Sequence, residues 1–164
     1  MSEEVNQIRR CVVVRDYMSA DPQTLGAEHS LLDAVLIMRR AGFRHIPVIE
    51  DGHVVGILSE RDVARAAPSM LLPLLPDDYN RLFEDTRVSK VMTKNPVFAA
   101  PDMPLAEAVD LLRSNRLGCL PVLESETLVG IITVSDMLRA LFDMVQTFDQ
   151  ENNDACEIPD SPEA

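Results

Sequence analysis

The chain has 164 residues, of which 46% are hydrophobic and 26% are charged, an ordinary composition for a globular protein. Its formal net charge of -12 disfavours nucleic acid and anionic membranes as partners, because both carry charge of the same sign. No apolar run is long enough to span a bilayer, and the N-terminus lacks a secretory signal pattern.

The first structural unit is expected over residues 12–67, after an N-terminal extension at 1–11. A short extended piece follows Pro22, and a helix is expected from Leu31 because Ser30 and Asp33 have the spacing of a capping box. Two strands and a last short helix complete the unit, over 45–50, 53–59 and 61–67. The strands flank Asp-Gly, a strong hairpin signal.

Residues 68–87 are expected to form a linker rich in leucine and proline. Its apolar residues are too many to leave in water. They could pack across a shared core or form a contact surface for a second subunit, and the sequence favours neither. A second unit is expected over residues 88–145, followed by an acidic, disordered tail at 146–164.

The second unit repeats the first with an offset of 74 residues. Between Val14–Ala66 and Val88–Ala140 no gap is needed, and 16 of the 53 aligned pairs are identical. Such self-similarity indicates one supersecondary unit used twice, here with the order β-α-β-β-α. One unit of this size is too small to bury a good core alone, so we expect an α/β (α+β) fold in which the two units pack together through their sheets.

The repeated pattern resembles a tandem pair of CBS domains, named after cystathionine β-synthase. The resemblance rests on "IPV" and "LPV", on "VGILSERD" and "VGIITVSD", and on their recurrence after 74 residues. It implies pseudo-symmetric repeats that bind AMP, ADP, ATP or S-adenosylmethionine, often as a homodimer. It also implies a regulatory module, not an enzyme, that acts on a separate and unidentified partner protein.

Each repeat ends its second strand with a Ser/Thr-x-x-Asp pattern, Ser59 to Asp62 and Thr133 to Asp136. This is the spacing of a helix capping box, which needs no ligand. The same geometry also suits a nucleotide, because a hydroxyl and helix amides can bind phosphate and an Asp can accept both ribose hydroxyls. The resemblance implies that Ser59 and Asp62 serve one site, and that Thr133, Ser135 and Asp136 serve the other.

A phosphate also needs a cation. The resemblance implies that Arg44 and His45, just before the first "IPV", serve the site of Asp136 in the other repeat. Arg61 is a further candidate phosphate contact. The equivalent positions in the second repeat are Gly118 and Cys119. We therefore expect the Asp136 site to prefer phosphorylated nucleotides and the Asp62 site to be weaker or to take a less anionic ligand. Each cation could equally be a solvated or locally bonded side chain.

The adenine ring is expected among aliphatic side chains and backbone amides. The residues assigned to it are Thr24, Ile46, Pro47, Val97 and Pro121. A protein core would use the same residue types, so this assignment competes with a purely structural one.

Other chemistry is sparse in the sequence. The three histidines lack companions at metal spacing, and no nucleophile with a base is legible, so we expect neither a metal nor a catalytic site. The three cysteines fit no disulfide framework, which favours a reducing, cytoplasmic location. Two rival functions remain: a ligand-independent dimerisation scaffold, and, ranked low, a small enzyme that uses Asp62 and Asp136 as paired carboxylates.

Overall fold

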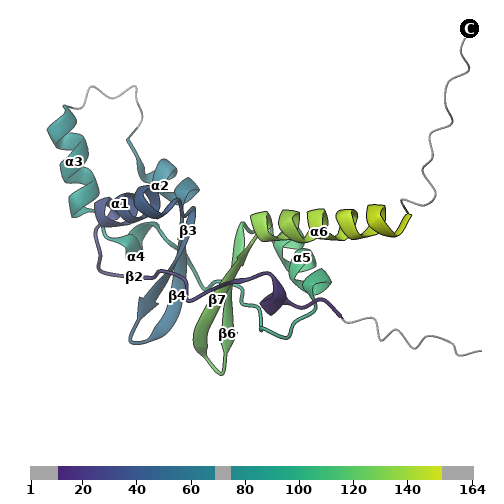
Figure 1. Cartoon of the computed structure of the whole chain (residues 1–164). Coiled ribbons are helices and arrows are strands. Elements are labelled where there is room, and N and C mark those ends of the chain that lie inside the picture. The colour runs from purple at the N-terminus through teal and green to yellow at the C-terminus, as the bar shows by residue number, and fades with distance from the viewer. Residues whose placement is uncertain (1–10, 69–74, 153–164) are drawn as a thin grey trace, which may run out of the picture.

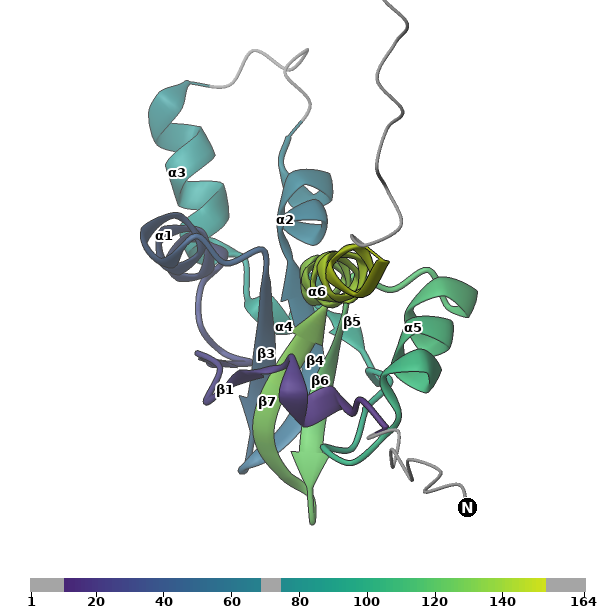
Figure 2. The same cartoon turned by 45° about the vertical axis from the view of Figure 1, so that its right-hand side comes forward.

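The computed structural model describes residues 11–68 and 75–152 (Figure 1). Two antiparallel hairpins form the centre of the molecule, one from each repeat. Their turns lie at one end, and helices α1, α2 and α6 gather at the other end (Figure 1, Figure 2). Each hairpin belongs to its own sheet, and the two sheets have the strand orders β2-β3-β4-β5 and β1-β7-β6.

The first repeat has the expected order β-α-β-β-α. Its elements are β2 (Leu25–Gly26), α1 (Leu31–Ala41), β3 (His45–Glu50), β4 (His53–Ser59) and α2 (Glu60–Ala66). The expected capping box begins α1, where the Ser30 hydroxyl accepts a hydrogen bond from the Asp33 N–H at 3.1 Å. Gly42 ends the helix in the left-handed conformation at φ 69°, as glycine commonly does.

The second repeat follows the same plan with two differences. Its elements are α4 (Val88–Val91), β5 (Thr93–Lys94), α5 (Leu105–Ser114), β6 (Cys119–Glu124), β7 (Thr127–Thr133) and α6 (Val134–Asn152). The strand equivalent to β2 is reduced to a parallel bridge between Ala99 and Val122. Helix α6 continues to Asn152, so residues 146–152 are helical although we expected them in the disordered tail. Residues 153–164 lie outside the described residues.

Each repeat contributes a two-residue strand to the sheet of the other. Strand β1 (Ser19–Ala20) pairs with β7, with Ser19 opposite Ile131, and β5 pairs with β4, with Thr93 opposite Ile57. A methionine before each exchanged strand packs against a glycine in the hairpin of the other repeat. A Cβ atom on Gly130 would lie 2.6 Å from the Met18 sulfur, and one on Gly56 would lie 2.5 Å from the Met92 sulfur. Glycine is therefore needed where each exchanged segment crosses the hairpin.

The core is divided between the repeats and joined at their interface. Leu58 and Ile46 are fully buried in the first cluster, and Leu120 and Ile132 are fully buried in the second. A third buried cluster joins the hairpins and consists of Ile57, Cys119 and Ile131. The sheets thus pack through aliphatic side chains, which confirms the expected α/β arrangement of two repeats.

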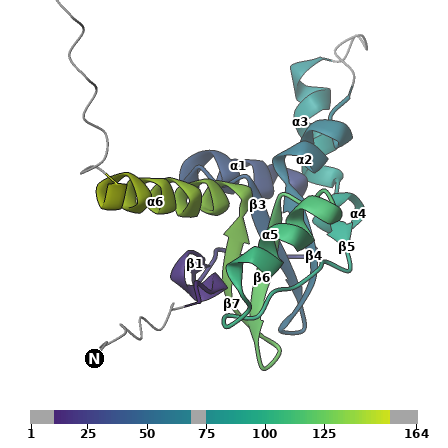
Figure 3. The same cartoon turned by 90° about the vertical axis from the view of Figure 1, so that its right-hand side faces the viewer.

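The region expected as a linker contains a helix, α3 (Pro76–Asp85), which begins with proline in its first turn. Phe83 is buried in the core of the first repeat and stacks on Tyr79 with ring centroids 5.0 Å apart. This part of the segment therefore packs on the core. Residues 69–74, which hold several of its leucines, lie outside the described residues. The short helix η1 (Val14–Asp16) lies next to the N-terminal end of the described chain, and α6 projects from the body (Figure 3).

Within residues 11–68 and 75–152, no helix combines the length and the apolar character that crossing a membrane requires.

Candidate ligand cleft between the repeats

A cleft of about 1220 Å³ opens between the two hairpins and is lined by both repeats. Its walls include the loops that precede β3 and β6, the first turns of α2 and α6, and the segment Ser19–Gln23. The repeats therefore present equivalent parts of their sequence to one shared space.

Nine of the thirteen predicted site residues line this cleft. They are Arg44, His45, Ser59, Arg61, Asp62, Val97, Thr133, Ser135 and Asp136. The other four, Thr24, Ile46, Pro47 and Pro121, are not among its lining residues. Ile46, Pro47 and Pro121 are fully buried. Ile46 belongs to the core of the first repeat, whereas Pro47 and Pro121 lie opposite Ile57 and Ile131, two residues of the cluster that joins the hairpins.

At the Asp136 end, the carboxylate is buried, with a residue exposure of 8%. Its Oδ2 accepts hydrogen bonds from the N–H and from the hydroxyl of Thr133, both at 2.8 Å. Its Oδ1 lies 3.1 Å from a guanidinium nitrogen of Arg139. A carboxylate can accept about four hydrogen bonds, so Oδ1 retains acceptor capacity toward the cleft.

At the Asp62 end, a complete capping box is present. The Ser59 N–H and hydroxyl both donate to Asp62 Oδ2, at 2.9 and 2.6 Å, and the Asp62 N–H donates back to the Ser59 hydroxyl at 3.2 Å. No ion pair to Asp62 is found in the described part of the chain, in contrast to Asp136 and Arg139. Both Asp residues thus act as helix caps and also line the cleft, so the two interpretations of the motif are compatible.

Arg44 reaches across the cleft to the second repeat. Its guanidinium donates a hydrogen bond to the Ser135 hydroxyl at 2.8 Å. A cation from the first repeat therefore lies beside the first turn of α6, the place where the positive end of the helix dipole and the Ser135 hydroxyl also favour an anion. The structure brings together the two residues that the sequence paired only through the resemblance.

His45 packs against the second repeat at Gly118. A Cβ atom on Gly118 would overlap the His45 ring, so glycine leaves room for the imidazole. Burial, followed by the nearby positive charge of Arg44, lowers the pKa of His45 below its usual value of 6.5. The imidazole is therefore neutral near pH 7 and can donate one hydrogen bond and accept another without adding a full charge.

Cys119 lies at the same interface and is buried. Burial, together with the negative charge of Asp62, raises the pKa of its thiol to about 12. The thiol stays protonated at neutral pH and behaves as a small apolar side chain. Asp62 is thus close enough to the second repeat for its charge to act on Cys119.

The half-buried His45 predicts a pH dependence of stability. The pKa of His45 is lower in the folded chain than in the unfolded chain. As the pH falls through 6.5, the unfolded chain therefore binds more protons at this residue than the folded chain does. We expect the free energy of unfolding to decrease from pH 7.5 towards pH 5.5, and the His45→Gln variant to lose part of this slope. Urea unfolding across this range measures it, and His53→Gln, at an exposed hairpin position, is the matched control. Identical slopes for the natural chain and His45→Gln would contradict the assignment.

Three arginines that the sequence did not predict as site residues lie in or beside the cleft. Arg65 and Arg116 line the cleft, and Arg139 pairs with Asp136. The spacing of three residues between Asp136 and Arg139 is a helical pairing signal that could have revealed this ion pair. The sequence carries no such signal for Arg116, which aligns with Gly42 of the first repeat.

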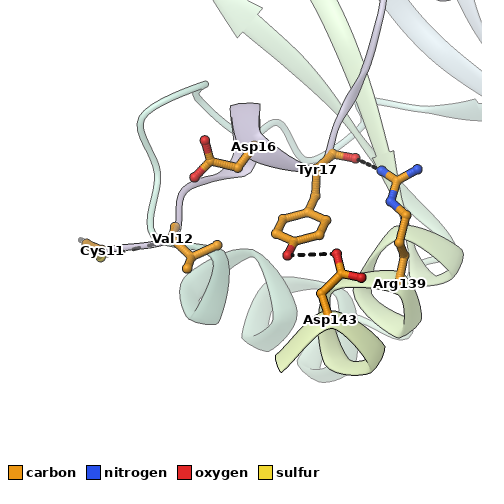
Figure 4. A pocket seen from close by; sticks show the side chains of 6 residues that line it. All are labelled: Cys11, Val12, Asp16, Tyr17, Arg139 and Asp143. Atoms are coloured by element: carbon orange, nitrogen blue, oxygen red, sulfur yellow. Dashed lines mark hydrogen bonds between the residues drawn. The ribbon is translucent and has the colours of Figure 1, made fainter. Parts of the chain in front are cut away.

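Arg139 also connects the cleft to a second, smaller pocket of about 380 Å³ (Figure 4). Its guanidinium donates to the backbone carbonyl of Tyr17 and lies 5.8 Å from the centre of the Tyr17 ring. The Tyr17 hydroxyl donates to Asp143 at 3.2 Å. These contacts hold the N-terminal segment against α6, and Arg139 links them to Asp136.

Comparison with known proteins agrees with this architecture. A family model for the CBS domain matches residues 14–69 and 88–143. This chain belongs to the CBS domain family. A CBS domain-containing protein from Dictyostelium discoideum is 31% identical over 137 residues, which cover 82% of this chain and 94% of the relative.

Solved CBS domain pairs share the fold. The pair of protein MJ0100, solved in complex with 5'-methylthioadenosine and S-adenosyl-L-methionine, has a TM-score of 0.68 at 23% identity and covers 82% of this chain and 98% of its own. The structure of CBSX2 in complex with AMP has a TM-score of 0.66 at 24% identity and covers 81% and 98% of the two chains. At these identities the likeness concerns the fold of the CBS pair.

Within residues 11–68 and 75–152, no group of three or more His, Cys, Asp or Glu side chains is placed to hold a metal ion.

Proposed function

We propose that this CBS pair is a regulatory sensor that binds an adenosine-containing ligand in the cleft between its repeats. The observation that carries the proposal is the convergence in one cleft of both Ser/Thr-x-x-Asp motifs and of Arg44, which bonds Ser135 across the repeats. Proteins of the same fold were solved with AMP and with S-adenosyl-L-methionine, which supports the ligand class.

Each residue then has a role that follows from its chemistry. Asp136 and Asp62 accept hydrogen bonds from ribose hydroxyls, while Thr133, Ser135 and Ser59 offer hydroxyls to ribose or phosphate. Arg44 and Arg61 contact phosphate, with Arg44 favouring the Asp136 half, and neutral His45 provides a polar contact. Val97 lines the cleft as an apolar neighbour for adenine.

The signal would be a change in how the two repeats are held together. A ligand that contacts both repeats favours the closed arrangement by the difference between its affinities for the two arrangements. Ligand binding at Asp136 would alter its ion pair with Arg139. Because Arg139 also holds Tyr17 against α6, the position of the N-terminal segment would respond to the ligand. A separate protein would read the change, and we propose a regulatory role in the cytoplasm, not catalysis.

A thermal shift assay tests the proposal. We expect at least one of AMP, ADP, ATP and S-adenosylmethionine to raise the melting temperature. A ligand at about one hundred times its Kd adds roughly 2.7 kcal/mol to the free energy of unfolding. For a chain of this size that corresponds to roughly 5 to 10 °C. Guanosine monophosphate is the control, and the absence of a shift with every adenosine compound would refute the sensor.

The second candidate is a ligand-independent scaffold that forms homodimers. The observation that favours it is the exposed apolar surface of α6, where Leu138 and Leu141 are 62% and 56% exposed and Phe142 is 60% exposed. Apolar area of this kind is usual where another chain packs. A dimer in sedimentation experiments, together with no thermal shift by any adenosine compound, would favour the scaffold over the sensor.

A further inference from the structure

Arg116 adopts a backbone conformation that long side chains rarely take. Its φ is 55°, in the left-handed region, where the Cβ atom approaches the following carbonyl. The equivalent residue of the first repeat is Gly42, whose φ is 69° and which has no Cβ atom. The second repeat therefore keeps an arginine at a position where glycine would be less strained. A strained residue beside a cleft is a reason to look for a function.

The loop that holds Arg116 lines the cleft. It connects α5 to β6, and Arg116, Leu117, Gly118 and Cys119 all contribute to the cleft wall. Arg116 has no ion pair in the described part of the chain, where its backbone N–H donates to the Arg113 carbonyl at 3.3 Å. Its guanidinium is exposed and can meet a ligand without first breaking an ion pair.

The relation between the repeats places this loop beside Asp62. In the first repeat the loop before β3 carries Arg44, which bonds Ser135 near Asp136. The loop before β6 is its equivalent and faces the first repeat in the same manner. Two observations agree with this placement. Gly118 lies against the ring of His45, and the negative charge of Asp62 contributes to the raised pKa of Cys119.

We propose that Arg116 is a further cation, in addition to Arg61, that contacts ligand phosphate in the half of the cleft beside Asp62. This rests on the proposed function, since it requires that the cleft binds adenosine compounds. The Asp62 half was expected to bind phosphorylated ligands less well than the Asp136 half, because only Gly118 and Cys119 were considered there. A phosphate contact from Arg116 changes that expectation. With Arg116, the Asp62 half accepts a phosphorylated ligand such as AMP in preference to adenosine, because arginine forms charge-assisted hydrogen bonds with phosphate.

The test uses the full chain with Asp136→Ala, which leaves the Asp62 half as the binding site. Calorimetric titrations with AMP and with adenosine are compared before and after adding Arg116→Gly or Arg116→Asn, two residues that tolerate a positive φ. We expect each second change to weaken AMP binding about tenfold and to leave adenosine binding unchanged. Arg116→Lys is expected to keep part of the AMP affinity.

A matched control is Glu126→Gly. Glu126 has φ 69° in the turn between β6 and β7 and is not among the cleft residues, so the change relieves a similar conformation without altering ligand binding. We expect both glycine variants to keep or raise the melting temperature without ligand, which excludes misfolding as the cause of lost binding.

Three outcomes would overturn the inference about Arg116. The first is equal AMP affinity with and without Arg116. The second is no AMP binding in the Asp136→Ala chain although the natural chain binds AMP, which leaves the Asp136 half and the proposed function in place. The third is that the natural chain binds neither AMP nor any other adenosine compound, which removes the proposed function as well.

Discussion

Asp136→Ala is expected to weaken AMP binding about a hundredfold at the Asp136 half of the cleft. The carboxylate lines the cleft and retains acceptor capacity on Oδ1, so it can receive ribose hydroxyls. A hydrogen bond to a charged group contributes about 1.5 to 3 kcal/mol, and two such bonds correspond to a hundredfold or more in Kd. Calorimetric titration with AMP measures the affinity and the number of sites.

The control for this variant must separate ligand binding from helix capping. Asp33→Ala does so, because Asp33 forms the same kind of box with Ser30, with a hydroxyl-to-carboxylate distance of 2.7 Å, and is not among the cleft residues. Both variants are expected to lose about 1 kcal/mol of stability with the cap. Only Asp136→Ala should lose affinity. Equal AMP binding by the two variants would show that Asp136 is a cap and nothing more.

Gly130→Ala is expected to lower the free energy of unfolding by about 1 to 3 kcal/mol, the usual cost of an extra methyl group in a packed site. The added Cβ would lie 2.6 Å from the Met18 sulfur and 3.1 Å from the Ser19 carbonyl oxygen. One neighbour is a flexible side chain and the other is backbone of the exchanged strand β1, so the strand must shift as well. Urea unfolding followed by circular dichroism measures the loss.

A double-mutant cycle with Met18→Ala identifies the contact that causes this loss of stability. With Met18 shortened, the alanine at position 130 still meets the Ser19 carbonyl, so we expect its cost to become smaller but not to vanish. If Gly130→Ala costs nothing, or costs the same with and without the Met18 side chain, then glycine is not needed at the crossing of β1 and β7 to make room for Met18.

Much of the fold can be predicted from the sequence, because short segments carry the signals for helix caps and hairpin turns. Asp51-Gly52 between two runs of alternating apolar residues predicts the hairpin of β3 and β4, and Ser30 with Asp33 predicts the start of α1. The offset of 74 residues extends these assignments to the second repeat. The candidate site residues came mainly from the resemblance to CBS pairs, and nine of the thirteen line the cleft.

Sequence patterns are less informative about which side chains are buried by other parts of the chain. Ile46, Pro47 and Pro121 belong to a motif shared by both repeats, yet they are fully buried. Ile46 and Pro47 lie on opposite faces of β3, and both faces are covered, one by the core of the first repeat and the other by the second hairpin. The alternation along a strand does not show that another part of the chain covers its second face. The extent of α6 was underestimated for a similar reason, because the polar composition of residues 146–152 is compatible with an exposed helix as well as with a tail.

The sequence by itself determined the repeated β-α-β-β-α unit, its helix caps and its hairpins, because these depend on residues close together in the chain. Only the tertiary structure decided that β1 and β5 exchange between the repeats, that Arg44 reaches Ser135, and that Arg116 borders the cleft. Two-residue strands carry no periodic signal, and contacts between residues 91 positions apart, such as Arg44 and Ser135, arise only when two aliphatic faces pack. The physical reason is that hydrophobic burial is non-directional, so the register between the repeats is set by the fit of their side chains.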